Sequence, residues 1–171
     1  MNRSRAIGHG VPTAILDALQ DDGVDCLVHL HPPVHTVEEA REYWAHIAGA
    51  HAKNLFLKDA GGRLWLVVAP SESRVDLKRL PRIIGSKRLS FGAADLLAEV
   101  LGVSPGSVSP LAAMNDKQGR VTVALDASLM KAEIVNVHPL VNVATIGLTP
   151  GELVGFLTKR GHAPLVVDLA T

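Results

Sequence analysis

The stretch that decides the fold is HAKNLFLKDAGGRLWLVVA, residues 51–69. Its two ends, residues 51–57 and 63–69, are rich in side chains that suit a pleated, half-buried surface. Between them lies a turn-forming run, Asp59-Ala60-Gly61-Gly62, so the stretch predicts a β-hairpin. Residues 64–69 are apolar without interruption, which indicates a central strand buried on both faces.

Helices and strands follow one another outside this hairpin without regular alternation. Such a mixture predicts an α+β fold in which a mixed, mainly antiparallel sheet is flanked by helices. Thr36 and Thr149 are predicted N-caps, each with a glutamate three residues later, and Pro81 predicts either a kink or two short helices. The predicted helices are 12–20, 36–47, 76–85, 93–101 and 150–161, and the further strands are 24–30, 120–125, 133–137, 143–148 and 165–169.

The chain has the composition of an ordinary globular domain, with 171 residues, 47% hydrophobic and 20% charged. We expect a flexible N-terminus over residues 1–10 and a single domain over residues 11–171. No apolar run reaches the roughly 18 residues that a membrane span needs, and no secretory signal is apparent. The only cysteine, Cys26, is expected in the core. Together these features predict a cytoplasmic protein.

Charge is balanced over the whole chain but is uneven along it. There are 17 basic and 17 acidic residues, whereas a protein that coats long nucleic acid usually carries a positive excess. Residues 74–88 hold six basic side chains and one acid, Asp76. This segment either faces a phosphate backbone or is a solvated surface.

Several chemistries lack their sequence motifs. His29, His31 and His35 are close together, but Pro32 and Pro33 separate them, and no HExxH or CxxC pattern is present, so no metal site is expected. The chain also lacks the GxSxG, GxxxxGK[ST] and GxGxxG patterns. A serine triad and nucleotide hydrolysis therefore have no support.

Lys53 is the most unusual residue of the hairpin. Residues two apart in a strand share a face, which places Lys53 with Leu55 and Leu57. A lysine removed from water needs a charge partner or a lowered pKa. The alternative is that its side chain extends along the strand to reach water.

Two loops could complete a pocket. The pair His138-Pro139 interrupts two β-like runs, and it either places a histidine at a pocket mouth or makes an ordinary turn. Residues 106–110, GSVSP, form a small-residue loop whose backbone N–H groups could hold an oxyanion, although this pattern alone is weak.

Taken together, five segments resemble the YbaK-type aminoacyl-tRNA deacylases, relatives of the editing insertion of bacterial prolyl-tRNA synthetases. The resemblance extends over about residues 12–169, and the Lys53-Asn54 pair with its following Leu-Phe-Leu is most similar to freestanding deacylases of alanyl-tRNA(Pro). The segments are HPPVHTVEEA (31–40), GAHAKNLFLKD (49–59), RLSF (88–91), GVSPGSVSP (102–110) and HPLVN (138–142).

This resemblance implies a catalytic role for Lys53 and no cofactor. Lys58 and Arg88 become candidates for contacting tRNA, with plain surface charge as the alternative. One departure is Asn136-Val137, where the family often has glycine and an aromatic residue. The implied substrate-binding residues are Asn54, the loop residues Gly106, Ser107, Val108, Ser109 and Pro110, then His138, Pro139 and Asn142, and the wall residues Val34, His35 and Thr36.

The expected activity is hydrolysis of the ester that joins alanine to proline tRNA, which protects the fidelity of translation. Two alternatives remain: a deacylase of the same fold for cysteine, serine or threonine, and a tRNA-binding module without catalysis. The expected partners are the acceptor stem and CCA end of tRNA(Pro), with prolyl-tRNA synthetase as a further partner. The chain is expected to be a monomer.

Overall fold

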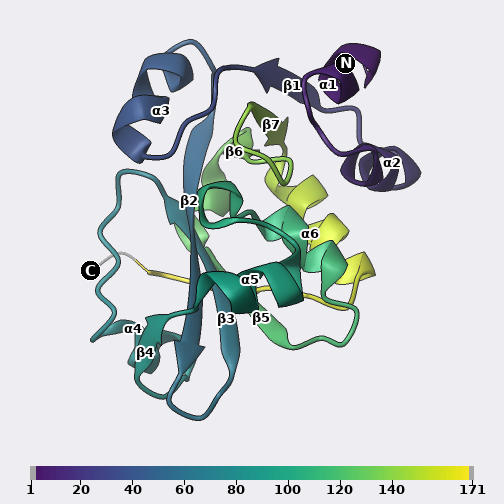
Figure 1. Cartoon of the computed structure of the whole chain (residues 1–171). Helices are drawn as coiled ribbons and strands as arrows, with labels where there is room; N and C mark the ends of the chain where they lie inside the picture. The colour runs from purple at the N-terminus through teal and green to yellow at the C-terminus, as the bar shows by residue number, and fades with distance from the viewer. Residues whose placement is uncertain (1–2, 170–171) are drawn as a thin grey trace.

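The computed structural model describes residues 3–169 and has one mixed sheet at its centre (Figure 1). The sheet has eight strands in the order β1-β7-β6-β2-β3-β5-β8, and β4 pairs with β2 outside this path. The strands are β1 Leu27–Leu30, β2 Ala50–Asp59, β3 Leu64–Pro70, β4 Leu89–Phe91, β5 Val121–Asp126, β6 Val135–Val137, β7 Ala144–Leu148 and β8 Leu165–Val167.

Four of the seven strand pairings are antiparallel: β1 with β7, β2 with β3, β2 with β4, and β6 with β7. The pairings of β2 with β6, β3 with β5 and β5 with β8 are parallel. The prediction of an α+β fold with a mixed, mainly antiparallel sheet is therefore confirmed.

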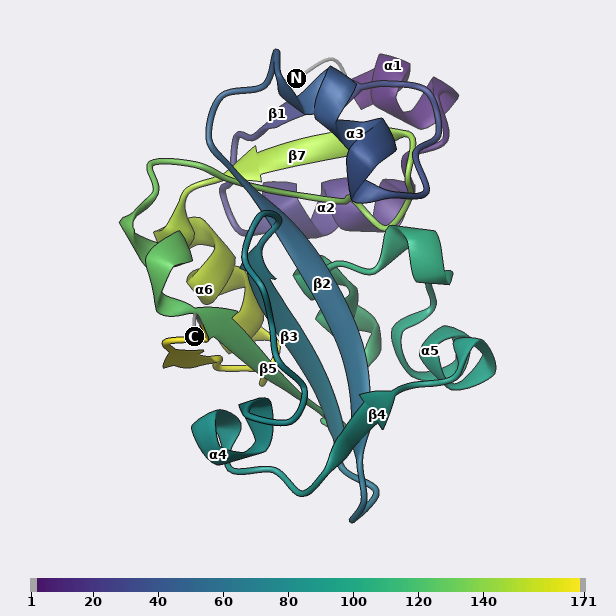
Figure 2. The same cartoon turned by 90° about the vertical axis from the view of Figure 1, so that its left-hand side faces the viewer.

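Helices and 3-10 turns cover both faces of the sheet (Figure 2). The larger core cluster contains buried residues of α2, α5 and α6, whereas the smaller one contains Leu80 and Ile84 of α4. The helices are α1 Arg3–Gly8, α2 Thr13–Asp21, α3 Val37–Trp44, α4 Leu80–Ile84, α5 Ala94–Leu101 and α6 Pro150–Lys159, and the 3-10 turns are η1 Pro105–Ser107, η2 Pro110–Asn115 and η3 Ala127–Lys131.

Strand β3 is the central strand that the apolar run predicted. Leu66 and Val68 belong to the larger cluster, while Trp65 and Val67 belong to the smaller one, and all four are at most 1% exposed. Alternate side chains thus enter two separate cores. The expectation that β3 is buried on both faces is confirmed.

The hairpin turn between β2 and β3 is fixed by the buried carboxylate of Asp59. One of its oxygens accepts hydrogen bonds from the N–H groups of Gly61 and Arg63, and the other accepts from the Trp65 indole and the Lys87 N–H. Burial would raise the pKa of Asp59, but these hydrogen bonds together lower it. The same carboxylate therefore joins the turn to the segment that precedes β4.

The expected start of one helix, residue 76, was wrong. Helix α4 begins at Leu80, so Pro81 lies in its first turn and causes no kink, because proline is tolerated where an N–H has no helical partner. Residues 3–8, within the segment expected to be flexible, form α1, and Ala6 is 1% exposed against the larger cluster. Residues 1–2 of the same segment lie outside the described residues.

We predict that Thr149→Ala lowers the free energy of unfolding by about 1 kcal/mol. The Thr149 hydroxyl accepts a hydrogen bond from the Glu152 N–H, and the Glu152 carboxylate accepts one from the Thr149 N–H, so the substitution breaks a complete capping box. Urea unfolding measures the change.

Thr158→Ala, in the exposed last turns of the same helix, is the matched control and should change stability by less than about 0.5 kcal/mol. Equal effects of the two substitutions would contradict a special role for the cap.

Candidate active site

The site lies at a gap in the sheet, on one edge of β2. Strand β3 occupies the opposite edge, while β6 pairs with Ala50 and His51 and β4 pairs with residues 57–59. Among the described residues, no strand pairs with residues 52–56 on this edge. The middle of β2 is therefore open to groups from other parts of the chain.

Backbone groups of β2 point into this gap. Across this edge, the Ala50 N–H donates to the Ile134 carbonyl and the Phe56 carbonyl accepts from the Gly92 N–H. Because backbone groups alternate between the two edges of a strand, those of Ala52 and Asn54 face the gap as well. The gap thus offers N–H and C=O groups to a ligand.

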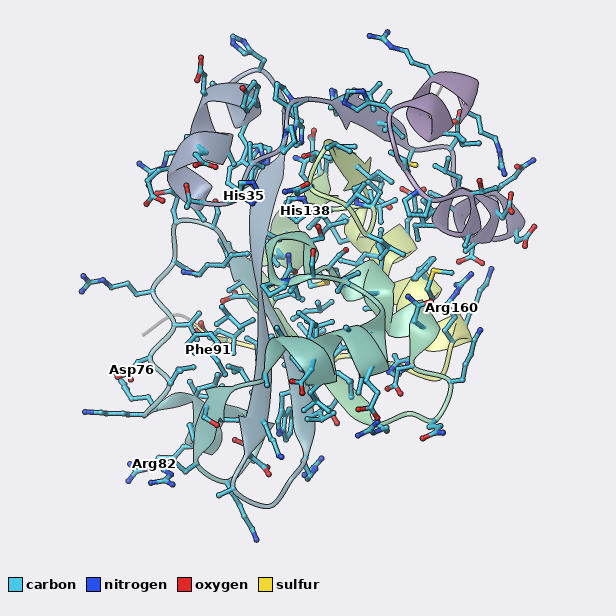
Figure 3. The ribbon with its side chains drawn as sticks, in the orientation of Figure 1. His35, Asp76, Arg82, Phe91, His138 and Arg160 are labelled. Atoms are coloured by element: carbon cyan, nitrogen blue, oxygen red, sulfur yellow. The ribbon has the colours of Figure 1, made fainter. Side chains whose placement is uncertain are left out.

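A cavity of about 170 Å³ fills this gap. Residues of β2 form one side, α3 with the loop before it forms a second, and the η1 loop and His138 complete it. Figure 3 shows His35 and His138 near each other at the α3 end of β2. The lining residues are Val34, His35, Thr36, Val37, Ala40, Trp44, Ala52, Lys53, Asn54, Pro105, Gly106, Val108 and His138.

Lys53 and Asn54 bring two different polar groups to the cavity. Lys53 is half-buried, and its ammonium donates a hydrogen bond to the carbonyl of Ser73 in the loop after β3. Asn54 Oδ1 is buried and has no hydrogen-bond partner in the described part of the chain. A buried acceptor without a donor is costly, so a ligand that donates to Asn54 would be favoured here.

The wall formed by residues 34–36 is held by backbone and side-chain hydrogen bonds. The Thr36 hydroxyl accepts from the Glu39 N–H at 3.2 Å, and the Glu39 carboxylate accepts from the His35 N–H at 2.7 Å. Asn142 Nδ2 donates to the Val34 carbonyl at 3.1 Å, and the Val34 N–H donates to the Asn142 carbonyl at 3.3 Å. Asn142 therefore braces the wall and does not line the cavity.

The η1 loop contributes fewer lining residues than the sequence suggested. Gly106 and Val108 line the cavity, and a methyl group on Gly106 would lie 3.7 Å from His35 Nδ1. Ser109 instead caps η2, where its hydroxyl accepts from the Leu111 N–H, and Pro110 begins that turn. Ser107, Ser109, Pro110 and Pro139 are buried but do not line the cavity.

Nδ1 of His138 is buried and makes no hydrogen bond with the part of the chain that the structure describes. Burial lowers the pKa of His138, and the nearby His31 lowers it further, while the Ala144 backbone partly opposes this. Two residues later, Leu140 has a φ of 66°, which an L side chain rarely adopts. The loop that places His138 thus stores backbone strain next to the cavity.

Trp44 is a site residue that the motifs did not reveal, and Asn136, noted only as a departure from the family pattern, has a role that they did not indicate. Trp44 lines the cavity and stacks on His51, with ring centroids 4.6 Å apart. Asn136 lies behind the cavity, where Nδ2 donates to the carbonyls of Ala48 and Ala50. The departure from the family pattern at this position therefore ties β6 to the start of β2, and no sequence periodicity identifies either role.

Lys58 and Arg88 lie away from the cavity, near the hairpin turn. Lys58 is five residues beyond Lys53 in β2, or about 17 Å along the strand, and points to the opposite face. Both Lys58 and Arg88 are exposed, and the Arg88 carbonyl accepts from the Ala60 N–H. They do not line the cavity, but both are accessible to a large ligand.

Other parts of the described chain offer less chemistry. A hollow of about 380 Å³ is lined by Lys78, Arg79, Arg82 and Ile83, with no acid among these lining residues. Residues 3–169 contain no group of three histidine, cysteine or acidic side chains placed to hold a metal ion. No described helix is long and apolar enough to cross a membrane.

Comparisons with known proteins identify similar chains. A family model described as "Aminoacyl-tRNA editing domain" matches residues 31–156. "Prolyl-tRNA synthetase associated domain-containing protein 1" of Xenopus laevis is 42% identical over 142 residues, which cover 80% of this chain and 84% of that protein. "Prolyl-tRNA editing protein ProX" of Acetoanaerobium sticklandii is 35% identical over 157 residues, which cover 91% and 96%.

The fold is also found among solved structures. A crystal structure described as a candidate trans-editing enzyme for prolyl tRNA synthetase matches with a TM-score of 0.69 and 22% identity, over 90% of this chain and 94% of that one. At this level of identity the match concerns the fold alone.

We predict that His138→Gln loses less of its free energy of unfolding than the wild type when the pH is lowered from 7 to 5. The pKa of His138 is below the ordinary value of about 6.5, so the unfolded chain takes up a proton that the folded chain resists. The neutral His138 side chain therefore makes its full contribution to stability above about pH 6.5, and this contribution is lost as the pH falls. Urea unfolding at both pH values measures the difference.

His46→Gln replaces an exposed histidine and is the control, which should keep the pH dependence of the wild type. An unchanged pH dependence in His138→Gln would show that His138 does not resist protonation in the folded protein.

Proposed function

The chain belongs to the family of aminoacyl-tRNA editing domains, and from this premise we propose that it removes alanine from wrongly charged tRNA(Pro). Family membership confirms two expectations from the sequence, the family itself and aminoacyl-tRNA deacylase activity. The observation that carries the proposal is the small cavity that joins the Lys53 ammonium, Asn54 Oδ1 and the open backbone of β2.

These groups suit hydrolysis of an ester. Water attack on the aminoacyl carbonyl creates a tetrahedral oxyanion, which N–H donors and a cation stabilise. Backbone N–H groups of the gap and the Lys53 ammonium supply such donors. The hydrogen bond to the Ser73 carbonyl holds that ammonium in place, which favours an electrostatic role over that of a base.

The apolar lining of the cavity supports alanine, a small apolar amino acid. A synthetase pocket for proline cannot fully reject alanine, because a missing methylene is worth only about 1–3 kcal/mol. A second cavity that admits alanine and clashes with proline solves this problem. Val34, Ala40, Trp44 and Ala52 give the 170 Å³ cavity an apolar wall of fixed shape.

A small hydroxylated amino acid, serine or threonine, is the second candidate. Asn54 Oδ1 and His138 Nδ1 are buried without hydrogen bonds to any described residue, and a hydroxyl could pair with one of them. An alanine side chain can satisfy neither atom. Comparing the release of serine and threonine with the release of alanine therefore separates the two candidate functions.

The tRNA partners follow from the same proposal. Lys58 and Arg88 are placed to contact phosphates of the acceptor stem while the CCA end enters the cavity. Prolyl-tRNA synthetase is a proposed further partner, and the proposed setting is a monomer in the cytoplasm. The relative from Acetoanaerobium sticklandii, named a prolyl-tRNA editing protein, supports the choice of tRNA.

We predict that wild-type protein releases alanine from alanyl-tRNA(Pro) and that Lys53→Ala slows this release about 100-fold or more, as loss of an oxyanion donor does. Lys53→Arg should retain more activity than Lys53→Ala, because arginine keeps the positive charge. Since arginine cannot act as a base, this result would support the electrostatic role of Lys53. Single-turnover release of labelled alanine measures both, with prolyl-, cysteinyl-, seryl- and threonyl-tRNA(Pro) in parallel.

Lys117→Ala removes an exposed lysine from the turn before β5 and should leave the rate unchanged. Release of alanine by Lys53→Ala at the wild-type rate would rule out the proposed role of Lys53. Faster release of serine or threonine than of alanine would favour the second candidate.

We predict that Lys58→Ala and Arg88→Ala each weaken binding of tRNA(Pro) and reduce the slope of log affinity against log salt by about 1. Each phosphate contact that a substitution removes lowers by about one the number of counterions released when tRNA binds. Filter binding over a range of salt concentrations measures the slope, and Lys117→Ala serves again as the control. Slopes equal to that of the wild type would assign both residues to plain surface charge.

A further inference from the structure

Phe91 is a large aromatic side chain that the fold leaves in solvent. It ends the three-residue strand β4 and is 65% exposed, whereas Trp65 and Phe156 are at most 1% exposed. Its neighbour Gly92 packs against the Phe56 ring so closely that an added methyl group would lie 2.5 Å from it. The backbone at Phe91 is thus fixed, while its ring is free to meet a ligand.

The register of β4 places this ring on the face of β2 that carries Lys53, one of the residues that line the cavity. Phe91 lies opposite Leu57, and paired residues of neighbouring strands point to the same face, which Lys53 and Leu55 share. Figure 3 places Phe91 and His35 on the same side of β2. Leu57 is four residues from Lys53, so Phe91 lies about 13 Å along the strand from the catalytic lysine.

Three cations lie close to Phe91 in the chain or in the sheet. Lys87 and Arg88 precede it, Lys58 lies opposite the neighbouring Ser90, and the first acid that follows it is Asp95. Figure 2 shows β4 and α3 at opposite ends of the open edge of β2. An exposed aromatic ring between a cavity and a group of cations is the arrangement by which proteins hold single-stranded nucleic acid.

We infer that Phe91 is a stacking platform for a base of the unpaired 3′ end of tRNA. This inference rests on the proposed function, in which the terminal ribose enters the cavity near Lys53. A stacked base rises about 3.4 Å per nucleotide, so a distance of about 13 Å leaves room for roughly two to four nucleotides between the two sites. The open edge of β2 is the path between them, and Lys58 and Arg88 receive the phosphates beyond it.

The test compares two RNA hairpins that carry the acceptor stem of tRNA(Pro), one with its unpaired 3′ end and one without it. Phe91→Ala should bind the complete hairpin at least about fivefold more weakly than the wild type, as loss of one stacked base does, and should bind the trimmed hairpin equally well. Phe91→Tyr should bind the complete hairpin like the wild type, whereas Phe91→Leu should resemble Phe91→Ala.

Leu27→Ala is the matched control, because Leu27 is 66% exposed on β1, in a different part of the sheet. It should change neither affinity. Equal affinities of Phe91→Ala and the wild type for the complete hairpin would overturn the inference, and so would full affinity in Phe91→Leu. A change of oligomeric state in Phe91→Ala with unchanged affinity would also overturn it, because the ring would then cover a second copy.

Alanine release by the wild type, measured on the same preparations, separates this inference from the proposed function. Release from alanyl-tRNA(Pro) with no effect of Phe91→Ala on hairpin binding overturns the stacking role alone. Failure of the wild type to release any amino acid overturns the proposed function itself. For Phe91→Ala we expect a raised KM for alanyl-tRNA(Pro) with little change in kcat, because the ring is remote from the ester.

Discussion

The structure depends on the incomplete pairing of one edge of β2. Strand β6 pairs at the beginning of β2 and β4 pairs at its end, so residues 52–56 between them have no strand neighbour on that side within the described chain. Backbone groups that no strand pairs with need other partners. A ten-residue strand that β3 anchors at residues 52–58 of the opposite edge can carry this opening without losing its shape.

The open edge explains how neighbouring residues reach one cavity. Side chains of Lys53 and Asn54 leave a strand on opposite faces and would be separated by a complete sheet. Because the cavity lies across the edge, both line it. The arrangement joins a cation, a buried acceptor and backbone N–H groups within one small volume, which suits the deacylase activity of this family.

The walls of the cavity come from segments that are distant in sequence and are held by a few hydrogen bonds. Asn142 binds the Val34 backbone, Glu39 binds the His35 N–H, and Asn136 ties β6 to the segment before β2. The unfavourable φ at Leu140 is maintained by the surrounding contacts. These hydrogen bonds fix the shape of the wall and therefore the space that a ligand can occupy.

The sequence by itself determined the hairpin, the central strand β3, the mixed fold and the family. These depend on local patterns, such as the apolar run of residues 64–69, the turn at Asp59 and five short motifs. It also selected Lys53, Asn54, Gly106 and His138, all of which line the cavity.

Only the tertiary structure decided which remaining motif residues face the ligand. Ser109 and Asn142 support the walls, whereas Trp44, which belongs to none of the five motifs, lines the cavity. Strand β4 was not predicted, because its three residues are too few for a pattern of alternation and its pairing partner is about thirty residues away in the chain. The sequence records which residues are present, but their placement around the gap depends on long-range pairing, and that pairing forms only when the whole sheet folds.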